Sequence, residues 1–167
     1  MVNIKNMEKI ASFTIDHCQL LRGIYVSRQD IMDGKVITTF DIRMKEPNRE
    51  PVLGNGAIHT IEHLVATYLR NDKEWKDKII YWGPMGCLTG NYLIMKGDIK
   101  PADIVGMLKQ AFQFVVDFEG DIPGAKPMDC GNYLLHDLPM AKWESKKYIK
   151  EVLDVIKPEN LVYPIKK

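Results

Sequence analysis

The sequence is organised around one stretch, Ala57-Ile58-His59-Thr60-Ile61-Glu62-His63-Leu64. It places His59, Glu62 and His63 in a His-x-x-Glu-His pattern, within a segment that predicts a helix from about Ala57 to Asn71. Residues three and four positions apart share a helix face, so these side chains point to one side. Two imidazoles one turn apart can chelate a divalent metal ion, with the carboxylate between them as a general base. The alternative is an ordinary amphipathic helix, but two of only four histidines on one face favour a metal site.

The composition is that of an ordinary globular protein. Its 167 residues fit one domain spanning 1–167, which is large enough to bury a core. A net charge of +1 gives no electrostatic footprint for nucleic acid. No apolar run approaches the roughly 18 residues that a membrane-spanning helix needs. The first ten residues carry charges where a secretory signal needs an apolar segment, so we expect a cytoplasmic protein.

The order of predicted elements indicates an α+β fold. Gly23 to Ile31 and Lys35 to Met44 are rich in strand-forming residues, and Asp33-Gly34 between them is a strong signal for a two-residue hairpin turn. Further strands are predicted at Ile79–Trp82 and Asn91–Met95. Further helices are predicted at Pro101–Phe118 and over Ala141–Ile156, the second with Pro139 as its start. Phe40 and Ile42 alternate with Asp41 and Arg43, so we expect one buried face, with Arg43 on the other.

Two histidines leave a catalytic metal site one protein ligand short of three. The third is a downstream carboxylate or a thiolate, and Cys130 is the strongest candidate because it lies in a Gly/Pro-rich loop that can bring its sulfur to a helix face. The alternative for Cys130 is a small buried hydrophobe. Three widely spaced cysteines make a poor disulfide framework, and we expect Cys18 to be structural.

Cys87 is the second informative thiol. It follows Pro84-Met85-Gly86 in a glycine-rich turn, a place where loops present reactive groups. Near a divalent cation its thiolate would be favoured and usable as an acid or base at neutral pH. The alternative is a turn cysteine without a chemical role.

The chain resembles the LuxS family of bacterial S-ribosylhomocysteine lyases across nearly its whole length. Six blocks carry the resemblance in the family's order: Ser12-Phe13-x-x-Asp16-His17, Phe40-Asp41-Ile42-Arg43, His59-Thr60-x-Glu62-His63-Leu64, Pro84-Met85-Gly86-Cys87-x-Thr89-Gly90, Cys130-Gly131-Asn132 and His136-Asp137-Leu138. One block can arise by chance, but six in order at compatible spacings make the match specific.

The resemblance implies a role for each matching residue. It assigns the metal to His59, His63 and Cys130, with Fe²⁺ as the native ion and Zn²⁺ or Co²⁺ as substitutes. It assigns acid/base chemistry to Glu62 and Cys87. It assigns substrate binding to four residues, Ser12, Phe13, His17 and Arg43.

The resemblance also implies the fold, assembly and reaction. The fold would be an antiparallel sheet with helices packed on one face, of the kind that LuxS proteins share with inverted zinc peptidases. The protein would be a homodimer with active sites at the subunit interface. Its reaction would convert S-ribosylhomocysteine into homocysteine and 4,5-dihydroxy-2,3-pentanedione, the precursor of a quorum-sensing autoinducer, within methionine and homocysteine metabolism.

Two positions depart from the family pattern. Leu88 stands where Arg or Gln is usual, and Asn91 stands where an aromatic residue is usual. A leucine beside Cys87 would alter the thiol's surroundings if it faced the site, and would matter less if it faced away. His136 matches a family block, but the sequence gives it no chemical role.

Two other functions compete with this reading. His-x-x-Glu-His is also the signature of inverted zinc peptidases, in which a downstream glutamate such as Glu119 or Glu144 would be the third ligand. Those peptidases are much longer chains, and Cys87 would have no role in one. The second competitor is a catalytically impaired LuxS relative or a non-enzymatic metal module, which a closed four-ligand metal site would favour.

Overall fold

A computed structural model describes residues 13–164 of the chain. A long hairpin opens the sheet, with β1 (Gly23–Met32) antiparallel to β2 (Lys35–Arg43). Asp33 and Gly34 join the strands with φ angles of 50° and 74°. Both values are positive, as a type I′ turn requires, so the predicted hairpin is confirmed.

The second half of the sheet is another antiparallel pair, β3 (Ile79–Pro84) and β4 (Gly90–Lys96). The strand order is β1-β2-β4-β3, so the later hairpin joins the earlier one through β4. A Cβ built at Gly90 would lie 2.1 Å from the carbonyl oxygen of Ile42. Only glycine therefore permits this close approach of β4 to β2.

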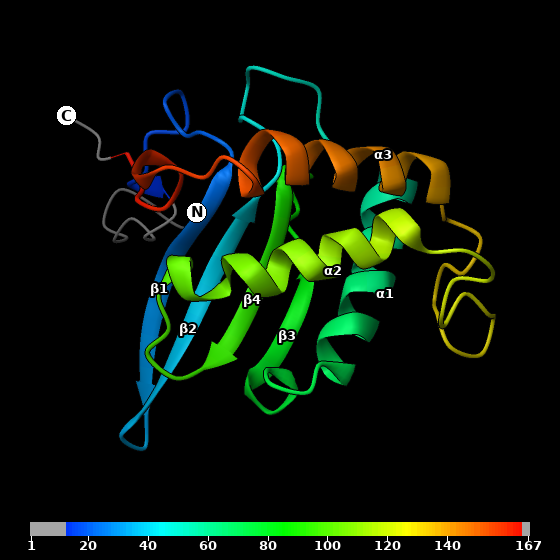
Figure 1. Cartoon of the computed structure of the whole chain (residues 1–167), viewed down its shortest axis with the longest axis horizontal. Helices are drawn as coiled ribbons and strands as arrows, with labels where there is room; N and C mark the ends of the chain where they lie inside the picture. The colour runs from blue at the N-terminus through cyan, green and yellow to red at the C-terminus, as the bar shows by residue number, and fades with distance from the viewer. Residues whose placement is uncertain (1–12, 165–167) are drawn as a thin grey trace, which may run out of the picture.

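Three helices cover the sheet. α1 (Asn55–Asn71) carries the His-x-x-Glu-His pattern, and α2 (Val105–Asp117) follows a short 3₁₀ turn. α3 (Leu138–Tyr148) begins after the N-cap Asp137, then continues as a π-helical turn, Ile149–Leu153. Figure 1 shows α2 and α3 lying across one face of the sheet, which confirms the α+β fold with helices on one face.

The two faces of β2 have different surroundings. Phe40 and Ile42 are fully buried and belong to the main hydrophobic core, together with Ile61 and Leu64 of α1. Side chains alternate along a strand, so Asp41 and Arg43 point to the opposite face. That face was expected to be the more polar one, yet Asp41 and Arg43 are also buried.

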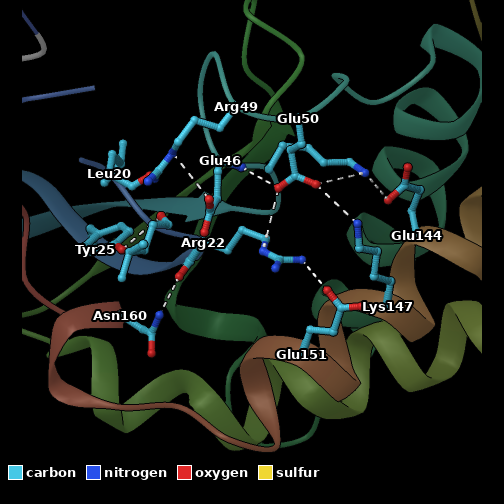
Figure 2. A network of polar contacts seen from close by, with 12 residues as sticks. Leu20, Arg22, Tyr25, Glu46, Arg49, Glu50, Glu144, Lys147, Glu151 and Asn160 are labelled. Carbon is cyan, nitrogen blue, oxygen red and sulfur yellow. Dashed lines mark hydrogen bonds and ion pairs between the residues drawn. The ribbon is translucent and has the colours of Figure 1, made fainter. Parts of the chain in front are cut away.

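An ion-pair network holds the connection between β2 and α1. Glu50, in this connection, accepts a hydrogen bond from Lys147 of α3 at 3.2 Å and lies 3.7 Å from Arg22. Lys45 is almost fully buried and pairs with Glu144 of α3 at 2.7 Å. Figure 2 shows Arg22 and Lys147 both reaching Glu50. The network therefore fixes the loop that delivers the chain to the start of α1.

Candidate metal centre and thiol pocket

The structure brings the predicted metal ligands together from distant parts of the chain. His59 and His63 lie one turn apart on α1, and their Nε2 atoms are 3.1 Å apart. Cys130, in the loop before α3, places its Sγ 3.4 Å from His59 Nε2. The potential ligand atoms all lie within 4.8 Å of one another, and no other group of this kind occurs in the described residues 13–164.

Hydrogen bonds on the far side of each imidazole fix its orientation. His59 Nδ1 lies 2.7 Å from the Leu135 carbonyl oxygen, and His63 Nδ1 lies 2.7 Å from that of Pro123. A carbonyl oxygen only accepts, so each Nδ1 must carry a proton. The Nε2 lone pairs are then free to bind a cation, as in most metal-binding histidines. The backbone N–H of Asn132 donates to Cys130 Sγ at 3.4 Å, which suits a thiolate.

These distances fit a divalent metal ion. In a tetrahedral site with metal–nitrogen bonds of about 2.0 Å and metal–sulfur bonds of about 2.3 Å, two nitrogens lie about 3.3 Å apart, and nitrogen and sulfur about 3.5 Å. The observed separations of 3.1 and 3.4 Å are close to those values. Three protein ligands also leave a coordination position open, as catalytic sites require and structural sites do not.

His136 completes the packing around the ligands. Its ring stacks on His59 with centroids 4.4 Å apart at 12°, and meets the His63 ring edge-on at 4.9 Å. Its Nδ1 lies 3.2 Å from the Thr60 hydroxyl. No role for His136 could be predicted from the sequence, and the ring stacking identifies it as a support for His59. Only its place in a family block could have drawn attention to it.

Glu62 occupies the turn of α1 between the two imidazoles and is partly exposed. Its carboxylate makes no hydrogen bond or ion pair with any group in residues 13–164. Its carboxylate is therefore not committed to a structural contact, which is compatible with a proton-transfer role.

Cys87 lies in a separate cavity of about 310 Å³, which we call the thiol pocket. Three predicted substrate-binding residues, Phe13, His17 and Arg43, line it, and the fourth, Ser12, lies outside the described residues. The remaining lining residues are Ile15, Ser27, Asp41, Pro47, Asn48, Val52, Thr89, Tyr92 and Tyr163.

A chain of polar contacts leads to the thiol. Arg43 donates from Nε to Asp41 Oδ1 at 3.0 Å and from Nη2 to Oδ2, so the pair is bidentate and buried. Arg43 Nη1 donates to the Thr89 hydroxyl and lies 3.8 Å from Cys87 Sγ. Because Thr89 Oγ1 accepts from Arg43, its own proton is free to point at Cys87 Sγ, 3.0 Å away.

These contacts change the acidity of the thiol. Burial raises the pKa of Cys87, but hydrogen bonds from Thr89 and the positive charge of Arg43 together outweigh burial, so the pKa lies below its ordinary value. Burial likewise lowers the pKa of Arg43, and the Asp41 carboxylate raises it above the ordinary value. Arg43 therefore remains a cation beside a thiol that ionises easily.

The metal ligands and the thiol pocket lie on different sides of the sheet. Asp41, Arg43 and Tyr92 line the pocket from the face opposite the helices, whereas α1 packs into the core on the helical face. No residue belongs to both groups. The family resemblance implies one site that contains both Cys87 and the metal, but within residues 13–164 of a single chain the two lie apart.

Both departures from the family pattern turn away from the thiol pocket. Leu88 adopts a positive φ of 58°, packs against the hydrophobic core and does not line the pocket. Asn91 is fully buried, and its Nδ2 donates to the Met44 sulfur at 3.6 Å. The leucine therefore leaves the chemical surroundings of Cys87 unchanged.

A larger hollow of about 600 Å³ lies beside the end of α1, lined by Tyr68, Phe114 and neighbouring polar residues. It contains no histidine or cysteine, so we assign no chemistry to it. None of the helices in residues 13–164 is long and apolar enough to cross a membrane.

Comparison with known proteins identifies the family of this chain. The sequence model of the S-Ribosylhomocysteinase (LuxS) family matches residues 10–159. The chain belongs to the LuxS family. A LuxS relative from Phocaeicola vulgatus, named S-ribosylhomocysteine lyase, is 70% identical over 160 residues, covering 96% of this chain and 99% of the relative. Relatives of the same name from Porphyromonas gingivalis and Clostridium beijerinckii are 64% and 57% identical over 158 residues, covering 95% of this chain and 99% of each relative.

The LuxS match spans every predicted site residue from Ser12 to Cys130. It ends at residue 159, so Tyr163, which lines the thiol pocket, lies beyond it.

Proposed function

We propose that the protein is an S-ribosylhomocysteine lyase, a carbon–sulfur lyase that releases homocysteine and 4,5-dihydroxy-2,3-pentanedione. The observation that carries the proposal is the His59, His63 and Cys130 group with its open ligand position, found in a chain 70% identical to a protein of that name. The thiol pocket, with its acidified cysteine, adds a second reactive group.

The chemistry of the substrate explains why both groups are needed. A thioether bond breaks readily only when it lies β to a carbonyl, and in the opened ribose the carbonyl is at C1 while sulfur is on C5. The carbonyl must therefore move to C2 and then to C3. Each shift removes a proton from the carbon next to the carbonyl and returns one to the former carbonyl carbon. Loss of a proton from C4 then expels the sulfur from C5 with its electron pair.

The proton transfers fall to two side chains. A divalent metal bound by His59, His63 and Cys130 would polarise a substrate oxygen and acidify the neighbouring C–H. Cys87, with its lowered pKa, is the base for the first shift. Glu62, on the metal-binding helix, serves the later shift and the elimination. Two bases are useful because the protons leave from several carbons.

Substrate binding is assigned to the thiol pocket. Arg43 offers a charge-assisted donor, and His17 lines the same cavity, with its Nδ1 3.1 Å from the Ile15 carbonyl. Phe13, of which 63% is exposed, covers one side. We also include Ser12 in the binding set.

We propose further that two copies of the chain build each active site as a homodimer. The separation of the metal ligands from the thiol pocket supports this, because a complete site needs both. The pocket is lined by Asp41, Arg43 and Tyr92 from the sheet face opposite the core, and a second copy placed against that face would present its α1 there. A two-fold interface would then form two equivalent sites.

We assign Fe²⁺ as the native ion and Zn²⁺ or Co²⁺ as substitutes, since one thiolate and two imidazoles suit all three. We place the enzyme in the cytoplasm, where its thiols stay reduced. Its second product is the chemical precursor of a quorum-sensing autoinducer, and its first product belongs to homocysteine metabolism.

Release of free thiol tests the proposed activity. Iron-loaded protein should liberate one thiol for each S-ribosylhomocysteine consumed, together with a dicarbonyl that o-phenylenediamine traps. Absence of thiol from wild-type protein with a full metal complement would refute the lyase. Cleavage of a peptide substrate instead would favour the peptidase alternative.

A further inference from the structure

The C-terminal segment packs against the start of the sheet. A 3₁₀ turn, Pro158–Asn160, is held by Asn160 Nδ2, which donates to the Arg22 carbonyl oxygen at 2.8 Å (Figure 2). A Cβ built at Gly23 would lie 2.1 Å from the carbonyl oxygen of Asn160. Glycine at the start of β1 therefore makes room for this segment, and the chain continues past it into the thiol pocket.

Tyr163 ends this path inside the pocket. Its ring stacks on Tyr25 of β1, with centroids 4.7 Å apart and 12° between the planes. Its hydroxyl donates to Asp41 Oδ2 at 2.7 Å. The next residue, Pro164, accepts a hydrogen bond from the Asp16 backbone N–H at 3.4 Å. The segments around Asp16 and Pro164 therefore lie side by side, and residues of both segments line the thiol pocket.

A series of polar contacts connects Tyr163 to the thiol of Cys87. Tyr163 and Arg43 Nη2 both donate to Asp41 Oδ2, and Arg43 Nη1 reaches Thr89 and Cys87. Burial, followed by the charge of Asp41, raises the pKa of Tyr163, so the phenol keeps its proton and remains a donor. Removing this donor leaves the carboxylate charge less compensated and less firmly oriented.

We propose that Tyr163 is a positioning residue of the active site, which holds Asp41 and, through it, aims Arg43 at Cys87. The proposal rests on the proposed lyase function, in which Cys87 transfers a proton. It concerns a residue beyond the part of the chain that the family model covers.

The effect on Cys87 has a definite direction. The titratable and charged groups that face the pocket beside Cys87 come from four parts of the chain: His17, Asp41, Arg43, Tyr92 and Tyr163. Without the Tyr163 hydroxyl, Asp41 presents more negative charge and holds Arg43 less firmly. A negative charge near a thiolate raises the pKa of the thiol. Tyr163→Phe should therefore raise the pKa of Cys87 while keeping the ring stacked on Tyr25.

The pH dependence of Cys87 alkylation by iodoacetamide measures the pKa of this thiol without the lyase reaction. Metal-loaded wild type and Tyr163→Phe are alkylated from pH 5 to 9, and the Cys87 peptide is quantified by mass spectrometry. We expect the midpoint to move upward in Tyr163→Phe, and the rate below the midpoint to fall by about threefold, the effect of half a pKa unit. An unchanged midpoint would overturn the proposal.

Two further variants separate positioning from folding. Val162→Ala changes an exposed neighbour that does not line the pocket and should leave the midpoint unchanged. Tyr163→Ala removes the ring as well and should also raise KM for S-ribosylhomocysteine. A fall in thermal stability without a midpoint shift in Tyr163→Phe would show a merely structural tyrosine. Lyase activity of the wild type is read separately, so failure of this proposal is distinguishable from failure of the proposed function.

Discussion

Gly124 packs against the edge of the His63 ring, and a Cβ built at Gly124 would lie 3.3 Å from His63 Nδ1. The same ring nitrogen is bound to the carbonyl oxygen of Pro123, the preceding residue. The loop before α3 therefore sets the orientation of a metal ligand through one hydrogen bond and one missing side chain.

Substituting Gly124 should consequently weaken the metal site. Gly124 has a φ of +73°, so Gly124→Ala strains the backbone and also crowds His63. Gly120→Ala is a matched control, because Gly120 has a φ of +97° with no atom within 4 Å of an added Cβ. Both variants should lose about 1 kcal/mol of stability. Only Gly124→Ala should lose metal affinity, roughly tenfold, in a competition titration with a chromophoric chelator. Equal affinities in the two variants would contradict this account.

The acidity of Cys87 should depend on the Thr89 hydroxyl. The thiolate forms above a pKa that lies below the ordinary thiol value, and Thr89 is one cause of that lowering. Thr89→Val removes the hydroxyl at nearly constant volume and should shift the pH midpoint of Cys87 alkylation upward. Thr89→Ser retains the donor and should keep the midpoint near that of the wild type. A midpoint in Thr89→Val equal to that in Thr89→Ser would remove Thr89 from the explanation.

The ring of His136 should strengthen metal binding by stacking on His59. His136→Ala removes the stacking partner of His59 and should reduce Zn²⁺ affinity roughly tenfold. His136→Phe restores an aromatic ring and should recover most of that loss, although it cannot hydrogen-bond to Thr60. If the phenylalanine and alanine variants bind Zn²⁺ equally weakly, the hydrogen bond rather than the stacking is what supports His59.

Two inactive variants should complement each other if the homodimer shares its sites. Cys87→Ala lacks the thiol and Cys130→Ala lacks a metal ligand, so each homodimer should be inactive. A mixed dimer contains one site with an intact thiol pocket from one copy and intact metal ligands from the other. Random pairing should restore about a quarter of wild-type activity. Persistent inactivity of a verified mixed dimer would place all the groups of one site within one copy.

The hairpin turn and the residues of the metal centre could be predicted from short stretches of sequence. Asp33-Gly34 specified the hairpin because glycine accepts the positive φ of its turn. The spacing of His59 and His63 specified a shared helix face, and Cys130 was selected as the third ligand from its loop context. Each of these inferences depends on a few neighbouring residues whose geometry the backbone nearly determines.

Long-range relationships were not accessible in the same way. Asp41 alternates with core residues, a pattern that predicts an exposed side chain, yet Asp41 is buried. Its carboxylate accepts hydrogen bonds from the neighbouring Arg43 and from Tyr163, which lies more than a hundred residues further along the chain. Nothing in the sequence near Tyr163 indicates that it reaches β2. The helix predicted over Ala141–Ile156, with its start at Pro139, begins at Leu138. It becomes a π-helical turn at Ile149, a change that apolar periodicity does not reveal.

A cobalt titration tests the central claim, that two imidazoles and the Cys130 thiolate bind one catalytic cation. Thiolate bound to Co²⁺ gives an intense near-ultraviolet charge-transfer absorption, which reports the sulfur ligand directly. We predict one equivalent of Co²⁺ with this absorption in wild type and in Cys87→Ala, and no such absorption in Cys130→Ala. Its persistence in Cys130→Ala, or its loss in Cys87→Ala, would contradict the account.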